Sequence, residues 1–222
     1  TEVNLSQPKL DKLNTRVAAV YDAIVKDATL ADVVTGMIPT GSWAHRMIIK
    51  PKADGEYDAD VLIEMNEMAG WEPKDYPNNL YHALHRHATY SKQEHGRKCR
   101  CVFLKYAAER NVACHLDLVP FITFDNGRRV IVNRTNNEWE PAMGSTDPSA
   151  FAEWAKRRDE LTDGHFRRVV RLIKYLRDER GSFDGMKSIV LTTLLGLQVT
   201  EDVGLNTTDY RNLPTALLTI VE

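Results

Sequence analysis

The segment Tyr57–Met65 (YDADVLIEM) constrains the fold most, because two carboxylates stand inside a strongly apolar strand pattern. The pattern first alternates and then becomes continuously apolar, which is typical of a strand buried on one side. Asp58 and Asp60 are two residues apart, so on a strand both side chains point to the same face, about 6–7 Å apart. Two such carboxylates repel each other unless a cation lies between them, and their oxygens suit Mg2+ or Mn2+.

A third carboxylate, Asp117, lies in the apolar segment HLDLVP. Leu116 and Leu118 would face the core, which places Asp117 on the opposite face of this strand. If the strand lies beside Tyr57–Met65, all three carboxylates can meet on one surface of the sheet, as a two-metal site requires. An isolated Asp-x-Asp is more often a solvated strand edge or turn, but the apolar flanks argue against that interpretation here.

Gly41 and Ser42 directly follow a short β-branched segment, Asp32–Pro39, that is predicted to be a strand. Gly41 permits close approach of the backbone to a ligand. Ser42 can cap a short helix over Trp43–Arg46, whose free N–H groups would bind a phosphate. A simple helix cap is the alternative interpretation of this pair.

Strand patterns dominate the first part of the chain and helical patterns the second. We expect helices at 10–28, 77–91, 148–161, 165–180, 186–199 and 216–222, and strands at 32–39, 57–65, 98–106, 111–120 and 129–133. The Pro, Gly and Ser residues of Glu140–Pro148 indicate a boundary. We therefore predict an α+β fold with a mixed sheet in a lobe of residues 1–145 and a helical lobe of residues 146–222, separated by a cleft. Because the sequence stops within a helical pattern, we expect the second lobe to be truncated.

Charge and cysteine usage limit the classes of partner. A net charge of -2 argues against constitutive binding of duplex DNA, although it leaves a nucleotide substrate open. The three cysteines, Cys99, Cys101 and Cys114, indicate a reduced, cytoplasmic protein. The apolar stretch Ile189–Leu197 is too short to span a bilayer, and the N-terminus lacks the apolar core of a signal peptide. We expect no association with a membrane.

A zinc site is conceivable where histidines and cysteines gather in the sequence. Cys99 and Cys101 form C-x-C and not C-x-x-C, so the spacing fits no standard pattern. We expect both on one face of a strand, where a buried cysteine acts as a small hydrophobic residue. The other candidate ligands are His82, His85, His87, His95, Cys114 and His115.

Other clusters have two interpretations each. The predicted helix 165–180 carries a basic run that is either a solvated face or a partial lining of the cleft, and we expect a mixture in which Lys174 points inward. The run consists of Arg167, Arg168, Arg171, Lys174 and Arg177. Trp139 and Trp154 are expected in the core rather than as platforms for a base, and Tyr210 could stack on a base.

Gly-Ser, then Asp-x-Asp, then a distant Asp in an apolar strand is a pattern that resembles the polymerase-β-like nucleotidyltransferase superfamily. Within it, GSWAHRMIIKP, EYDADVLIEM and CHLDLVPFI are most similar to the bacterial cyclic-oligonucleotide synthases of anti-phage defence. These are the DncV-like relatives of cyclic GMP–AMP synthase and oligoadenylate synthase. The resemblance covers roughly residues 10–222, and NNEWEP, RLIKYLRD and KSIVLTTLLG are similar to the family's helical lobe.

The resemblance implies roles for individual residues. Asp58 and Asp60 would bind two Mg2+ or Mn2+ ions and connect them to the triphosphate, and Asp117 would bind the catalytic ion and help activate the attacking hydroxyl. Gly41 and Ser42 would hold the β- and γ-phosphates of the donor.

From the helical lobe, Lys174 and Ser188 match positions that contact the triphosphate. A solvated helix lysine and a helix-facing hydroxyl are the respective alternatives.

The resemblance also implies an activity. The enzyme would join NTPs, ATP among them, into a cyclic di- or trinucleotide second messenger with release of pyrophosphate. Transfer of a nucleotide to an RNA end, a protein or an antibiotic is the alternative, since the same carboxylates would serve it. A catalytically silent nucleotide-binding scaffold is a third, and retention of all three carboxylates argues against it. A regulatory protein partner is compatible with the sequence.

Overall fold

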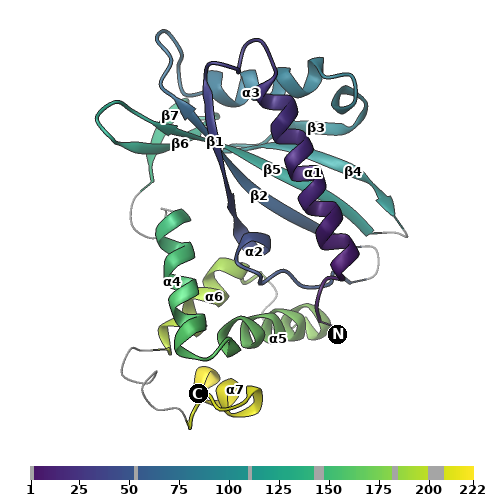
Figure 1. Ribbon diagram of the computed structural model, residues 1–222, viewed down its shortest axis with the longest axis vertical. Helices are drawn as coiled ribbons and strands as arrows, with labels where there is room; N and C mark the ends of the chain where they lie inside the picture. Colours follow the sequence, from purple (N-terminus) through teal and green to yellow (C-terminus); the bar gives the residue numbers. More distant parts are fainter. Residues whose placement is uncertain (1–2, 53–54, 110–111, 143–147, 182–184, 200–207) are drawn as a thin grey trace.

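Seven strands form one mixed sheet, in the order β1–β2–β5–β4–β3 with β6 paired to β5 and β7 paired to β6 (Figure 1). Strands β2 and β5 are parallel, and every other pair is antiparallel. The computed structural model describes residues 3–52, 55–109, 112–142, 148–181, 185–199 and 208–222. The strands are β1 (Val34–Thr40), β2 (Glu56–Asn66), β3 (Glu94–Arg97), β4 (Val102–Glu109), β5 (Val112–Thr123), β6 (Arg129–Asn133) and β7 (Glu138–Pro141).

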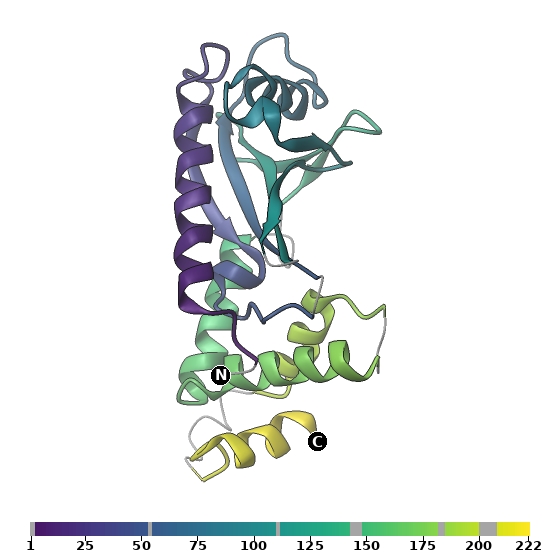
Figure 2. The same ribbon diagram turned by 90° about the vertical axis from the view of Figure 1, so that its right-hand side faces the viewer.

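The helices divide into those that cover the sheet and those that lie beyond its end. Helices α1 and α3 contact each other and pack on the sheet, whereas α4, α5, α6 and α7 lie together in the lower half of Figures 1 and 2. The helices are α1 (Gln7–Val25), α2 (Gly41–Ala44), α3 (Asp75–Arg86), α4 (Pro148–Leu161), α5 (His165–Arg180), α6 (Ser188–Leu197) and α7 (Leu213–Val221), with a 3-10 turn at Tyr90–Lys92. None of the described helices is long and apolar enough to cross a bilayer.

Alternation along β2 decides which way its carboxylates point. Tyr57, Ala59 and Val61 are buried in the hydrophobic core that also contains residues of α1 and α3. Because successive side chains of a strand point to opposite faces, Asp58 and Asp60 face away from these helices.

Strand β5 follows the same rule. Leu116 and Leu118 belong to the core beneath α1 and α3, whereas Phe121 belongs to a separate small cluster with Leu62 of β2. Asp117 has the parity of Phe121, so it lies on the face away from α1 and α3.

The helices beyond the sheet have a core of their own. Phe166, Val169 and Val170 of α5 are fully buried there. Trp154 packs against this core and meets the ring of Phe166 edge-on, which confirms the core interpretation of this tryptophan. Tyr210 is 4% exposed in the same core, so its suggested stacking on a base is wrong.

The turn between β3 and β4 differs from the predicted strand 98–106. Lys98 N–H donates to the Cys101 carbonyl at 2.8 Å and closes a turn, and the strand begins only at Val102. Cys99 is therefore exposed and Cys101 buried, and the prediction that both share one strand face was wrong. Strand β3 was also not predicted, because its four residues, Glu94–Arg97, carry no apolar alternation.

The segment NNEWEP belongs to the sheet and not to the helical part. It contains β7, and Trp139 within it packs on the main core with its ring edge-on to Tyr76. The core interpretation of Trp139 is thus confirmed, and the assignment of NNEWEP to the helical lobe was wrong. The predicted boundary at residue 145 lies outside the described residues.

Candidate active site

The carboxylate segment of β2 is held between two strands. On one side Thr40, the last residue of β1, pairs with Asp60. On the other side the parallel register with β5 places Asp60 opposite Asp117 and Asp58 opposite His115. Side chains at paired positions of a parallel ladder share a face, so the structure brings Asp58, Asp60 and Asp117 to one surface of the sheet.

The carboxylate of Asp60 is buried beside two other carboxylates. Burial, followed by repulsion from Asp58 and Asp117, raises the pKa of Asp60 to about 7. Within the described part of the chain, no donor hydrogen bonds its carboxylate. The charges of Lys98 and Lys174 offset the repulsion from Asp58 and Asp117 only in part, and hard divalent cations bind oxygen ligands of this type. The residues present therefore fit Mg2+ or Mn2+.

The carboxylate of Asp117 is paired with a neighbouring lysine. Lys98 Nζ donates to both of its oxygens, at 2.9 and 2.7 Å. Burial and then Asp117 raise the pKa of the adjacent Cys101 thiol to about 12. Among the residues that the structure describes, no three His, Cys, Asp or Glu side chains converge closely enough to hold a metal ion. Binding of a shared ion here thus requires the carboxylates to reorient.

Gly41 is required where β1 turns into α2. Its φ is +69°, and a Cβ at this position would lie 2.0 Å from Oδ2 of Asp60. Only glycine combines this backbone conformation with such close approach to the carboxylate. Helix α2 begins at Gly41 with Thr40 as its N-cap, so the prediction that Ser42 caps a helix over Trp43–Arg46 was wrong.

The hydroxyl of Ser42 instead contacts α5. Lys174 Nζ donates to Ser42 Oγ at 2.8 Å and to the Met47 carbonyl at 2.9 Å. Lys174 is only 4% exposed, so its interpretation as a solvated helix lysine is excluded. Burial, followed by repulsion from Arg177, lowers its pKa to about 8. A contact between Lys174 and a triphosphate stays a prediction.

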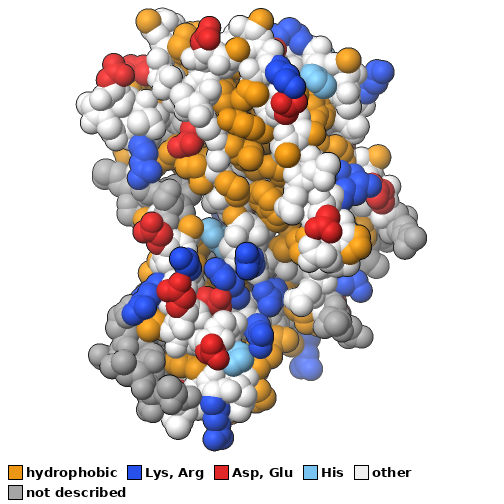
Figure 3. All heavy atoms as spheres, viewed as in Figure 1, with side chains coloured by type: hydrophobic (Ala, Val, Ile, Leu, Met, Phe, Trp, Pro, Cys, Tyr) orange, Lys and Arg blue, Asp and Glu red, His pale blue; other side chains and the backbone are white. Residues whose placement is uncertain are grey.

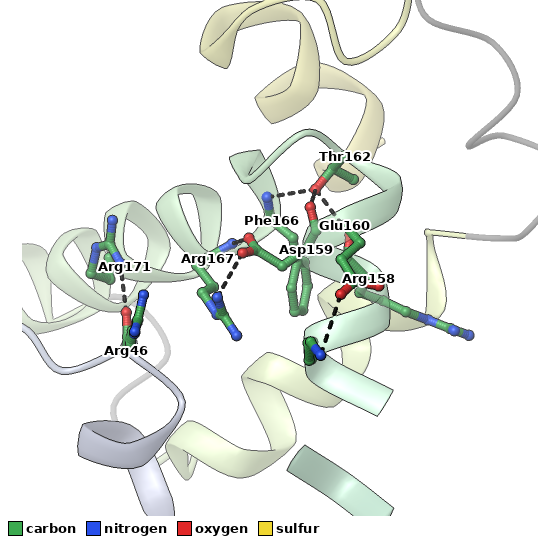
Figure 4. Close-up of polar contacts among 9 residues, drawn as sticks. Arg46, Arg158, Asp159, Glu160, Thr162, Phe166, Arg167 and Arg171 are labelled. Atoms are coloured by element: carbon green, nitrogen blue, oxygen red, sulfur yellow. Dashed lines mark hydrogen bonds and ion pairs between the residues drawn. The ribbon is translucent and has the colours of Figure 1, made fainter. Parts of the chain in front are cut away.

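The arginines of the basic run on α5 contact different parts of the molecule. Arg177 Nη1 donates to Ser188 Oγ at 3.2 Å, which places Ser188 near the same helix. Arg167 pairs with Asp159 at 2.8 Å, and Arg171 donates to the carbonyl of Arg46 (Figure 4). Figure 3 shows Lys and Arg side chains gathered over the helical part on this face. The run is thus a mixture, as predicted: Lys174 points inward, and the arginines named here have separate partners.

These residues border a common cleft of about 720 Å3, which is within the size range of small-molecule sites. The carboxylates of Asp58 and Asp60 contribute to its lining, whereas Asp117 does not. The other lining residues from the predicted site are Gly41, Ser42, Lys174 and Ser188. Residues within 40–60, which include parts of β1, α2 and β2, therefore meet residues of α4, α5 and α6 around one cavity.

Residues 1–159 match the family of the Second Messenger Oligonucleotide or Dinucleotide Synthetase domain. The chain belongs to this family. No curated protein sequence matches it significantly. The family and the fold together identify a nucleotidyltransferase of the cyclic-oligonucleotide synthase type.

Solved structures share the α+β fold. CdnG of Bradyrhizobium diazoefficiens, in complex with GTP, has a TM-score of 0.72 and 19% identity over 99% of this chain and 71% of its own. Vibrio cholerae DncV in its 3'-deoxy ATP bound form has a TM-score of 0.71 and 14% identity, over 99% and 73%. CdnC of E. coli MS115-1, in complex with HORMA-deltaN, has a TM-score of 0.65 and 19% identity, over 97% and 64%. The chain thus spans about two thirds to three quarters of the lengths of these proteins.

Two neighbours of Asp117 in this synthetase were not among the predicted site residues. Lys98 and Cys101 reach Asp117 only because the segment between β3 and β4 is a turn. Predicted as a strand, the segment gave no reason to place them there.

Proposed function

We propose that the chain joins NTPs into a cyclic di- or trinucleotide second messenger, with release of pyrophosphate, in anti-phage defence. The observation that carries the proposal is the register of the parallel strands β2 and β5. It sets Asp60 directly opposite Asp117, next to a cleft that Gly41 and Ser42 also line. We also propose that residues 1–145 and 146–222 are the two lobes of the enzyme, which meet at this cleft.

The carboxylates prepare the reaction. Two Mg2+ or Mn2+ ions held by Asp58, Asp60 and Asp117 would supply Lewis acidity and lower the pKa of the attacking hydroxyl. Asp58 and Asp60 orient the donor at the cleft, and Asp117 helps the attacking ribose hydroxyl to lose its proton, which passes to solvent. The hydroxyl oxygen forms a bond to the α-phosphorus as the bond to the bridging oxygen breaks, and pyrophosphate leaves. A second transfer within the same cleft closes the ring.

Other residues hold the pyrophosphate leaving group. Gly41 brings the backbone close to the β- and γ-phosphates. Ser42 and Lys174 contact each other at the first turn of α2, where they would also contact the triphosphate. Because the pKa of Lys174 is lowered to about 8, a bound triphosphate would favour its charged form and so gain attraction. Ser188, the first residue of α6, lines the same cleft beside α5.

The solved structures of similar proteins support the proposed substrates and partner. The CdnG structure contains GTP and the DncV structure contains 3'-deoxy ATP, which supports NTPs as substrates, with ATP among them. The E. coli CdnC structure contains a HORMA protein, which supports a regulatory protein partner for this enzyme. We place the enzyme in the cytoplasm.

The test is incubation of the purified chain with all four NTPs and Mg2+ or Mn2+, followed by mass spectrometry. Phosphatase-resistant cyclic products are expected from the wild type, and none from Asp58→Ala/Asp60→Ala. Asp125→Asn, in the exposed turn before β6, is the matched control and should retain activity. Undiminished product from the double variant would refute the metal assignment. Nucleotide transfer only to an added RNA, protein or antibiotic would instead establish the alternative acceptor.

A further inference from the structure

Lys98 contacts Asp117, which is the one of the three carboxylates Asp58, Asp60 and Asp117 that does not line the cleft. Its Nζ donates to both oxygens of Asp117, so both oxygens that would serve as metal ligands accept from the ammonium group. Metal ions and lysine compete for the same negative charge, because a carboxylate oxygen that accepts from an ammonium is less available as a ligand.

The main chain holds the lysine in place at its base. Lys98 N–H donates to Cys101, and the Lys98 carbonyl accepts from Arg134 Nε at 3.2 Å. Arg134 N–H also donates to the Cys99 carbonyl at 2.8 Å. The turn between β3 and β4 is therefore fixed to the end of β6, and the Lys98 backbone stays beside Asp117.

The side chain of Lys98 reaches the surface. It is 50% exposed, whereas that of Asp117 is 16% exposed. The ammonium also lies 5.6 Å from the ring centroid of Phe103, so Asp117 is not its sole favourable contact among the described residues. Ion pairs of exposed side chains contribute about 0–1 kcal/mol to stability, and the half-exposed Lys98 ammonium has solvent as an alternative partner.

We propose that the ammonium group of Lys98 is a displaceable cation that competes with the catalytic divalent ion for Asp117. It thereby sets the ion concentration at which the metal site fills. The inference rests on the proposed function, because it takes Asp117 as a metal ligand. Lys98 is a positioning residue: in the absence of the ion it holds Asp117, and it withdraws when the ion binds.

The test measures binding of Mn2+ to the chelator-treated full chain, without nucleotide, by the EPR signal of the free ion. Lys98→Met removes the charge and keeps an unbranched apolar side chain beside Phe103. We expect it to lower the Kd for Mn2+ about three- to tenfold, and Lys98→Gln to do the same. Lys98→Arg keeps the charge and can bind the carboxylate through two parallel hydrogen bonds, so its Kd should equal or exceed that of the wild type.

Two further variants give the matched controls. Arg100→Gln removes a cation from the same turn, but Arg100 pairs with Glu140 and not with Asp117, so Mn2+ binding should not change. In an Asp117→Asn background, Lys98→Met should no longer tighten binding.

Failure of the Lys98 inference and failure of the proposed metal site give different results. Equal or weaker Mn2+ binding by both Lys98→Met and Lys98→Gln would overturn the inference. A higher KM for NTP with unchanged Mn2+ binding would also overturn it, because Lys98 would then act on the substrate. If the wild type binds Mn2+ no better than Asp58→Ala/Asp60→Ala, the proposed metal site fails, and the role of Lys98 fails with it.

Discussion

Replacement of Asp60 by Asn should stabilise the metal-free protein, by an amount that grows as the pH rises from about 4 to about 7 and is constant above that. The substitution keeps the size of the side chain and removes its ability to ionise. The pKa of Asp60 is raised from 3.8 to about 7 by burial and by two neighbouring carboxylates. A group whose pKa rises on folding favours the folded state when protonated, so its contribution is fully present below about pH 3.8 and is lost progressively until the pH passes about 7.

The size of the effect follows from the shift. From 3.8 to about 7 is about three pKa units, and at about 1.4 kcal/mol per unit the ionised side chain costs about 4 kcal/mol above pH 7. Relief of half of this cost would raise Tm by about 4–8 °C in a chain of this size. Below pH 4 wild-type Asp60 is protonated, so the two proteins should unfold at nearly the same temperature.

The assay is thermal unfolding in EDTA at pH 4, 6 and 8, followed by intrinsic fluorescence. Asp125→Asn removes an exposed carboxylate from a turn and should show no pH-dependent difference from the wild type. Addition of Mg2+ or Mn2+ at pH 8 should stabilise the wild type and not Asp60→Asn. A lower Tm for Asp60→Asn at pH 8, or a difference that does not change with pH, would refute the reasoning.

Three further substitutions test the packing and charge of the site and of the helical core. Gly41→Ala should abolish activity and lower stability by at least about 1–3 kcal/mol, because φ is +69° and the new methyl would lie 2.0 Å from Asp60; an active, stable variant would contradict the close approach. Lys174→Met should raise the KM for NTP at least about tenfold, which steady-state kinetics measures. It should not lower stability at pH 7, because the pKa of the buried lysine is lowered and its charged form destabilises the fold below about pH 8. Denaturant unfolding checks this second part. Gly196→Ala should destabilise by about 1–3 kcal/mol in urea unfolding, because its Cβ would lie 2.2 Å from Trp154, and a neutral result would show that the tryptophan can shift.

The sequence predicted the parts of the site that depend on alternation. Asp58, Asp60 and Asp117 each stand between apolar neighbours of opposite parity, so their common face followed once β2 and β5 were taken as neighbours. The fold class also followed, because strand periods dominate the first part of the chain and helical periods the second.

The parts that depend on tertiary contacts could not be predicted. Lys98–Cys101 reads as the start of a strand, and only the hydrogen bonds from Arg134 show why it is a turn. Residues 138–141 lack a strand period of their own and become β7 through pairing with β6. Likewise, no local pattern reveals that Lys174 reaches Ser42, a residue 132 positions away.

The central claim is that three carboxylates on β2 and β5 share divalent ions beside the phosphate site at α2. It is tested most directly by an anomalous difference map from crystals grown with Mn2+ and a non-hydrolysable NTP analogue. The account predicts two peaks about 3.5–4 Å apart among Asp58, Asp60 and Asp117, with the triphosphate on Gly41 and Ser42. Mn2+ bound elsewhere, or a triphosphate bound away from α2, would contradict it.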